Sequence, residues 1–289
     1  MGGADAAIFE AVAQRLEARG HEVTRLPESV FQGAGADRRP HYDAATDRLL
    51  AEADAFFTMA RSHETLFELE RLLQQHPRPC VNTPDGIYIC GDRDLLSFRM
   101  KKTGVPQPQT VIAQTFRYSG DDEPPSAYDL VGQSACPFWL KRVMGHTEVP
   151  QDVVFVERPE AALPALDDFF RRHHTLVAVC EHVEGDLVKF YGVAGSGFFD
   201  WDYADPAHSK FGQEAINGAA HRYAFDVAQL QADSERLAGD IGVPVYGGDA
   251  IVRPDGSYVV IDFNDWPSFS RCRDSAAEAI AGEIERLKG

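Results

Sequence analysis

The fold of this chain is decided by residues 246–269, which read Tyr246-Gly-Gly-Asp-Ala-Ile-Val-Arg-Pro-Asp-Gly-Ser-Tyr-Val-Val-Ile-Asp-Phe-Asn-Asp-Trp-Pro-Ser-Phe269. Two β-rich runs, Asp249–Val252 and Tyr258–Phe263, stand on either side of Pro254-Asp255-Gly256. Proline, aspartate and glycine in a short connection favour a tight turn. We therefore predict a β-hairpin at residues 249–263.

Three oxygen-bearing side chains fall on this hairpin, Asp249 on the first strand and Asp262 and Asn264 on the second. Because side chains alternate between the two faces of a strand, Asp262 and Asn264 share a face, and strand pairing brings Asp249 beside them. A few protein oxygens, completed by substrate phosphates, are typical ligands of Mg²⁺. The hairpin therefore predicts a magnesium site, whereas the simpler explanation is a surface hairpin with solvated acidic residues.

The composition is that of a globular protein of 289 residues, 44% hydrophobic and 25% charged, which is long enough for two or three small domains. The net charge of −17 argues against nucleic acid or an anionic membrane as the main partner, since both require a basic surface. The sequence contains neither a run of about 18 apolar residues nor a signal-peptide pattern at its start. We expect a cytoplasmic protein with reduced thiols, because its five cysteines form no Cys-x-x-Cys pair: Cys80, Cys90, Cys136, Cys180 and Cys272.

Residues 1–82 alternate predicted helices and strands, a pattern typical of a parallel sheet covered by helices. They begin with Gly2-Gly3, a plain turn or a weak phosphate-binding turn, followed by a helix that ends at Gly20. A domain of this kind normally begins with a strand before the glycines. We therefore expect that strand to be missing and this domain to be the least stable part of the chain. Its other expected elements are strands at His21–Leu26, Ala55–Ala60 and Pro79–Asn82, and helices at Ala44–Ala53 and around Leu66–Leu73.

Residues 83–193 are predicted to form a helical connection, which ends at Gly104, and then a small βαβ-type module. Its single long helix is expected to direct Leu163, Leu166, Phe169 and Phe170 toward the interior. The predicted strands are Thr110–Ala113, Pro137–Val143, Val153–Val156, Leu176–Val183 and Leu187–Val193.

Residues 195–223 show no strong periodicity and are rich in glycine, aspartate, histidine and aromatic residues. A stretch of this length is either a long loop beside the site or a surface excursion. Helices are expected at Asp226–Ile241 and Ser275–Leu287, the second with Ile280 and Ile284 facing inward.

Four segments, in this order, resemble the ATP-grasp superfamily. Residues 82–108, with Asp92-Arg93 and Gly104-Val-Pro106, resemble the segment that enters an ATP-grasp domain. Pro137-Phe-Trp-Leu-Lys141 is similar to the strand whose lysine reaches the nucleotide phosphates. Cys180-Glu-His-Val-Glu-Gly-Asp186 resembles the hinge that pairs with adenine, and the three hairpin oxygens, ahead of Pro267, match the metal positions. The resemblance covers roughly residues 80–289 and is to the peptide-ligase or glutathione synthetase type, with some likeness to the inositol-trisphosphate kinase branch.

The resemblance implies ATP and Mg²⁺ as cofactors and three catalytic cations. Arg93 would balance phosphate charge through its guanidinium fork and Lys141 as a point charge. Lys189, on the strand after the hinge, would point toward the same cleft. Each of the three could instead be an ordinary solvated or snorkelling cation.

The same resemblance assigns nucleotide contacts to the hinge. Adenine would bond to the backbone at Glu181 and Val183. Asp186, or alternatively Glu184, would accept hydrogen bonds from the ribose hydroxyls. A simple acidic turn is the alternative explanation of these two carboxylates.

The fold implied is α/β, an ATP-grasp fold of two α+β lobes that sandwich the nucleotide, preceded by a truncated Rossmann-like domain. Residues 1–82 would form the Rossmann-like domain and residues 83–109 a connecting segment. Residues 110–183 would form the lid lobe, and residues 184–289 the C-terminal lobe with the metal site.

The activity implied is ATP- and Mg²⁺-dependent ligation, in which a carboxylate of a small molecule or peptide is activated as an acyl phosphate for attack by an amine. The alternatives are a small-molecule kinase and a nucleotide-binding protein without turnover. Residues 195–225 offer only Lys210 and Arg222 as basic residues, which favours a weakly charged substrate and hence the ligase. Two departures from the family pattern are the single Gly145 in the short loop after Lys141 and Ser268 after the proline. We expect a small-molecule substrate, no nucleic acid and no membrane partner, and allow for a homodimer.

Overall fold

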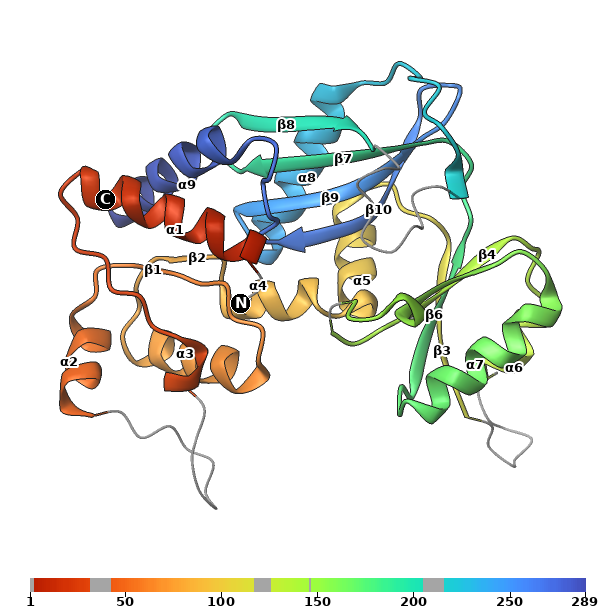
Figure 1. The fold of residues 1–289 in the computed structure, drawn as a ribbon, viewed down its shortest axis with the longest axis horizontal. Coiled ribbons are helices and arrows are strands. Elements are labelled where there is room, and N and C mark those ends of the chain that lie inside the picture. The colour runs from red at the N-terminus through yellow and green to blue at the C-terminus, as the bar shows by residue number, and fades with distance from the viewer. Residues whose placement is uncertain (1–2, 32–42, 117–125, 146, 205–215) are drawn as a thin grey trace.

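The computed structural model describes residues 3–31, 43–116, 126–145, 147–204 and 216–289, and its strands form three sheets (Figure 1). One sheet has two strands, in the order β1-β2, and the other two sheets have four strands each, in the orders β3-β6-β4-β5 and β10-β9-β7-β8. None of the helices in these ranges is both long and apolar enough to cross a membrane.

The predicted hairpin is confirmed. Strands β9 (Val245–Val252) and β10 (Tyr258–Asp265) pair antiparallel, and Gly256 in the turn has a φ of 84°, which a residue with a side chain rarely adopts. The pairing shifts register between Val260 and Asp262, and after this shift Asp262 lies opposite Asp249. The acidic pair therefore lies directly across one ladder of the sheet.

Strands β7 (Asp186–Val193) and β8 (Phe198–Tyr203) complete the sheet of the hairpin, with β7 paired to β9 and β8 to β7. Strand β8 was not predicted from the sequence, because residues 195–223 show no strong periodicity. The aromatic run Phe198-Phe-Asp-Trp-Asp-Tyr203 is a strand signal that the surrounding glycines obscured. Residues 205–215 lie outside the described ranges.

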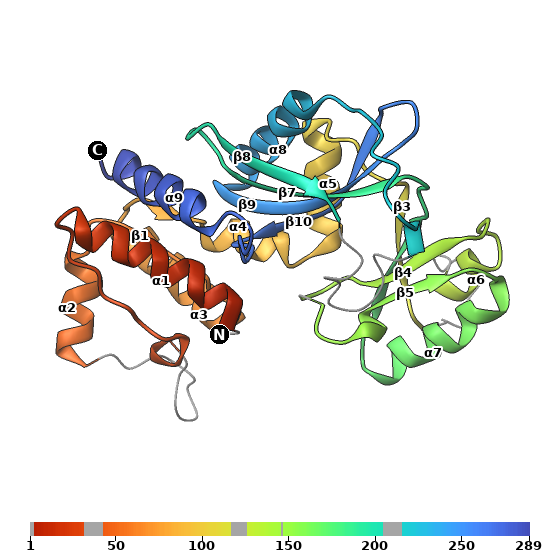
Figure 2. The same ribbon diagram turned by 45° about the horizontal axis from the view of Figure 1, so that its top comes forward.

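Three helices pack on one face of the sheet β10-β9-β7-β8 (Figure 2). Helices α4 (Pro84–Cys90), α5 (Arg93–Thr103) and α8 (Val227–Ile241) share one apolar cluster with β7, β9 and β10. Helix α5 begins after Asp92, whose side chain caps it, and ends at Gly104, with a φ of 72°. The predicted helical connection is thereby confirmed, and it holds Arg93 at the start of α5.

Helix α1 (Gly3–Ala18) packs beside the C-terminal helix α9 (Arg273–Lys288) in a second cluster (Figure 2). Ile8 and Val12 of α1 are fully buried there, as is Ile280 of α9. The apolar face of α1 is therefore covered by the C-terminal part of the chain. Of the Gly2-Gly3 pair, Gly3 begins α1 and Gly2 lies outside the described residues.

The remaining N-terminal elements are helices α2 (Ala44–Glu52) and α3 (His63–Gln75) and the parallel pair β1 (Phe56–Phe57) and β2 (Cys80–Val81). A larger Rossmann-like sheet is not seen in this part of the described chain. The strand predicted at His21–Leu26 is wrong. Val23 and Leu26 instead pack into two separate apolar clusters, while Arg25 pairs with acidic residues of α1.

The sheet β3-β6-β4-β5 is wholly antiparallel, so the predicted βαβ-type module is wrong in its topology. Its strands are β3 (Thr110–Gln114), β4 (Phe138–Arg142), β5 (Val153–Val156) and β6 (Leu176–Glu181), and helices α6 (Ala127–Val131) and α7 (Ala162–Arg171) pack on it. After β6 the chain crosses to β7 of the other sheet. Residues 182–185 therefore connect the two four-stranded sheets.

Helix α7 buries only half of the apolar residues expected to face inward. Leu166 and Phe169 are fully buried, whereas Leu163 is 48% exposed and Phe170 is 51% exposed. Successive residues of a helix are separated by about 100° around its axis, so the neighbours of a buried stripe turn away from it. The prediction was wrong for Leu163 and Phe170 because they lie one residue beyond Ala162 and Phe169, which belong to the buried stripe.

Candidate active site

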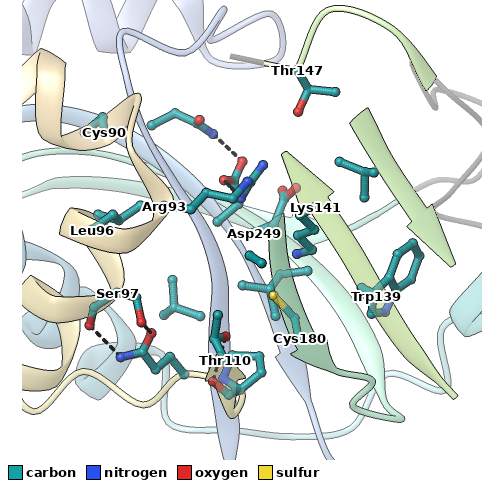
Figure 3. A pocket seen from close by; sticks show the side chains of 18 of the residues that line it. Cys90, Arg93, Leu96, Ser97, Thr110, Trp139, Lys141, Thr147, Cys180 and Asp249 are labelled. Atoms are coloured by element: carbon teal, nitrogen blue, oxygen red, sulfur yellow. Dashed lines mark hydrogen bonds and ion pairs between the residues drawn. The ribbon is translucent and has the colours of Figure 1, made fainter. Parts of the chain in front are cut away.

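A cavity of about 720 Å³ lies between the two four-stranded sheets, and it is lined from β4 and β6 on one side and from β7, β9 and β10 on the other (Figure 3). Helix α5 contributes a third wall. This volume lies in the range of natural small-molecule sites. Arg93, Lys141 and Asp249 converge on its centre (Figure 3).

All three oxygen-bearing side chains of the hairpin line this cavity. Asp249 and Asp262 are partners across the ladder, and the amide nitrogen of Asn264 donates to Asp262 at 2.9 Å. The described residues contain no group of three or more histidine, cysteine, aspartate or glutamate side chains that could hold a metal. Two carboxylates and one amide fit Mg²⁺ only if phosphate oxygens complete the shell, which is its usual mode of binding beside a nucleotide. Their role as metal ligands remains a prediction.

Each of the two carboxylates faces a cation. Lys189 Nζ lies 3.5 Å from Asp249 Oδ1. Arg93 NH1 lies 3.5 Å from Asp262 Oδ1, while Arg93 Nε donates to the carbonyl of Arg142 at 3.0 Å. The hydrogen bond to the carbonyl of Arg142 holds the guanidinium of Arg93 in place. Both predicted cations, Arg93 and Lys189, thus lie beside the predicted acidic pair.

Lys141 differs from these two cations because its ammonium group has no carboxylate within 4 Å among the described residues. It extends from β4 into the cavity, and burial lowers its pKa, an effect to which the nearby Arg93 adds. A partly buried ammonium without an acidic partner is costly in free energy. An anionic ligand in the cavity would supply the missing partner.

The loop after β4 is held in place by Asp152, whose carboxylate is fully buried. It accepts hydrogen bonds from the backbone N–H groups of Glu148 at 2.8 Å and Val149 at 3.2 Å and pairs with Arg172. Burial alone would raise the pKa of Asp152, but these hydrogen bonds lower it to about 2. Since Glu148 lines the cavity, Asp152 positions one of its walls.

Residues 181–183 line the cavity where the chain leaves β6. Val183 packs in a cluster with Leu187, Ile251 and Ile261. The indole N–H of Trp139 donates to His182 Nδ1 at 3.1 Å, and burial lowers the pKa of His182. The ring is therefore expected to be neutral at pH 7, with its proton on Nε2. The apolar side chains of Val183, Leu187 and Ile251 line the cavity together with the ring of Trp139, and such walls suit a flat heterocycle.

Solved structures with the same arrangement of elements were found by comparison. A RimK domain ATP-grasp protein from Sphaerobacter thermophilus superposes with a TM-score of 0.66 at 18% identity, over 96% of this chain and 95% of that one. D-alanine–D-alanine ligase from Bacillus anthracis, in complex with ATP, gives a TM-score of 0.63 at 12% identity, over 99% and 93% of the two chains. The VanG D-Ala:D-Ser ligase from Enterococcus faecalis gives 0.58 at 15% identity, over 82% and 73%.

The chain has the ATP-grasp fold. The resemblance noted in the sequence is thus confirmed at the level of the fold. No family model and no curated protein sequence matches the chain. Because one fold hosts many activities, the chemistry has to be argued from the site itself.

Asp186, one of the two acidic residues predicted to contact the ribose, is hydrogen-bonded inside the protein. Asp186 is 2% exposed, and its carboxylate accepts the backbone N–H groups of His221 at 2.7 Å and Tyr223 at 2.8 Å. Burial would raise the pKa of Asp186, but these hydrogen bonds outweigh it and leave the pKa lowered. Neither Asp186 nor Glu184 lines the cavity, so the prediction of a ribose acceptor at these two positions is not supported. Asp186 instead fastens the segment 216–223 to the hinge.

Several residues that line the cavity were not predicted from the sequence. Arg61, from the N-terminal part, donates through NH1 to both carboxylate oxygens of Asp265, at 2.9 and 2.8 Å, and the side chain of Asp265 is fully buried. Trp139 and His182 at the hinge and Asn217 on the segment 216–223 line the cavity as well. Arg61 and Asn217 carried no recognisable signal, because their partners lie far away along the sequence.

Proposed function

We propose that this protein is an ATP- and Mg²⁺-dependent carboxylate–amine ligase. The observation that carries the proposal is the convergence of Lys141, Arg93 and the pair Asp249–Asp262 on one cavity that apolar side chains beside the hinge also line. This layout matches the polarity of ATP, which has an apolar base at one end and a highly charged triphosphate at the other. The ligases among the structures of similar fold support the same class of chemistry.

The proposed reaction has two steps. A carboxylate oxygen of the first substrate attacks the γ-phosphorus of ATP, the bond from that phosphorus to the β-γ bridging oxygen breaks, and ADP leaves with the electron pair. The nitrogen of an amine then attacks the carbonyl carbon of the acyl phosphate, inorganic phosphate leaves, and the amine loses a proton. The sum is ATP, carboxylate and amine giving ADP, phosphate and amide.

The residues of the chain assist these steps mainly by binding and positioning. Lys141 and Arg93 bind the phosphoryl oxygens and stabilise the charge that spreads over them in the transition state. Mg²⁺, held by Asp249, Asp262 and Asn264, would neutralise charge on the β- and γ-phosphates. The loop that Asp152 anchors lines the cavity, and exclusion of water from the site would protect an acyl phosphate from hydrolysis.

Hydroxylamine tests the proposal without knowledge of the natural amine. The purified protein is incubated with ATP, Mg²⁺, hydroxylamine and a panel of amino acids and short peptides, and ADP, phosphate and acyl hydroxamate are measured. If the protein is a ligase, ADP, phosphate and acyl hydroxamate should form in equal amounts with at least one carboxylate. The Asp262→Asn variant should form none of them. A phosphorylated product with no free phosphate would instead identify a phosphotransferase. ATP binding without turnover across panels of carboxylates and alcohols would identify a nucleotide-binding protein without catalysis.

A further inference from the structure

Two side chains hold the segment 216–223 against the hinge, one from the segment and one from the hinge. From the segment, the amide nitrogen of Asn217 donates to the carbonyl oxygens of Val183 at 3.2 Å and Gly185 at 3.0 Å. From the hinge, Asp186 accepts two backbone N–H groups of the segment, as described above. The segment therefore has a defined position at the hinge end of the cavity, and Asn217 lines that end.

These contacts determine how the amide of Asn217 is oriented. A carbonyl oxygen only accepts hydrogen bonds, so the NH₂ group must face Val183 and Gly185, and the oxygen Oδ1 must face away from them. Within the described part of the chain, no donor reaches this oxygen. Asn217 thus offers an acceptor at the wall of the cavity while its donors are satisfied by the hinge.

Three other polar side chains near the hinge make hydrogen bonds inside the protein. The carboxylate of Asp186 holds the segment, and Glu181 Oε2 accepts the backbone N–H of Gln109 at 3.2 Å. Gln107 is bonded through both ends of its amide to Ser97. A side chain at Gly185 would place its Cβ 2.3 Å from the carbonyl oxygen of Val252, so that position cannot supply one.

We propose that Asn217 accepts a hydrogen bond from a ribose hydroxyl of the bound nucleotide and so determines a preference for ribonucleotides. The inference rests on the proposed function, because it requires adenine to lie at residues 181–183. The sugar is bonded to the base, so it lies next to the hinge residues that Asn217 contacts. Because the acceptor is a neutral amide, the loss of this bond should weaken binding by about 2- to 12-fold, less than the loss of a bond to a carboxylate.

The test compares ADP with 2′-deoxy-ADP and 3′-deoxy-ADP by calorimetry, with Mg²⁺ present. The wild-type protein should bind one of the deoxynucleotides about 2- to 12-fold more weakly than ADP, for whichever hydroxyl Asn217 accepts. In Asn217→Ala and Asn217→Leu the ratio of the dissociation constants of this deoxynucleotide and ADP should fall to about one. These variants lack the acceptor, so removal of the hydroxyl breaks no hydrogen bond.

The matched control is His221→Ala, which removes a ring that lies 3.4 Å from Asp186 and stacks on Tyr223. This variant loosens the same segment but keeps the amide, so its ratio should remain that of the wild type. A purely structural role for Asn217 would weaken ADP and both deoxynucleotides equally, and that result would overturn the inference. Equal affinities of the wild-type protein for all three nucleotides would overturn it without any variant. If the wild-type protein bound no ADP at all, the proposed function would fail, and this inference with it.

Discussion

Replacement of Lys141 by methionine tests two effects of this residue separately, its effect on the stability of the fold and its effect on nucleotide binding. Its ammonium is partly buried without an acidic partner in the described chain, and burial lowers its pKa. A lowered pKa means that the charged lysine is less stable in the folded state than in the unfolded state. This destabilisation of the fold is fully present at pH values below the lowered pKa. Methionine has a similar length and no charge, so the ligand-free Lys141→Met protein should melt at the same temperature as the wild type or higher.

The nucleotide should respond in the opposite direction. A charge-assisted hydrogen bond contributes about 1.5–3 kcal/mol, which corresponds to roughly 10- to 150-fold in the dissociation constant of ATP. Adenosine has no phosphate for Lys141 to bind, so its affinity should not change. As the pH rises through the lowered pKa, the wild-type protein should lose ATP affinity below pH 10.5, the ordinary lysine value, whereas Lys141→Met should show no such loss.

Thermal melting with and without ATP and Mg²⁺, together with calorimetry of ATP and adenosine, measures both effects. Lys101→Met is the matched control, because it removes the same charge from the exposed end of α5. Equal losses of ATP and adenosine affinity would refute the assignment of Lys141 to phosphate. A ligand-free variant clearly less stable than the wild type would refute the claim that its charge lacks a partner.

The other predictions concern three carboxylates. Asp262→Asn should lower Mg²⁺-dependent turnover by more than the roughly 10- to 100-fold loss that is typical when a residue behind a metal ligand is replaced, and it should leave the melting temperature unchanged. Asp255→Asn, in the exposed turn, is the control. Turnover of Asp262→Asn at the wild-type rate would contradict the metal assignment. Arg61→Met should destabilise the fold by about 3–5 kcal/mol in urea, since it leaves Asp265 buried and unpaired, and Asp265→Leu should restore part of the loss. Because the pKa of Asp152 is lowered to about 2 from 3.8, its carboxylate stabilises the fold above about pH 4 and loses that contribution as the pH falls toward 2. The difference in stability between wild type and Asp152→Asn should therefore shrink over that range, and a constant difference would show that the carboxylate is not the cause.

The elements predicted correctly are those whose cause is local. The turn at Pro254-Asp255-Gly256 and the helix stop at Gly104 depend on backbone conformations that few residues adopt, so composition alone reveals them. The pairing of Asp249 with Asp262 follows from the hairpin once its turn is known. Strand β8 was missed because glycines on either side diluted its aromatic run.

The sequence by itself determined most of the helices and the acidic hairpin, and through the order of the four matching segments the ATP-grasp fold. Only the tertiary structure decided how the carboxylates of the site are used. Asp186 binds backbone groups of residues 221 and 223, and Asp265 binds Arg61, more than 200 positions away along the chain. The physical reason is that the role of a polar group depends on the partners that surround it after folding, and sequence periodicity does not reveal partners distant along the chain.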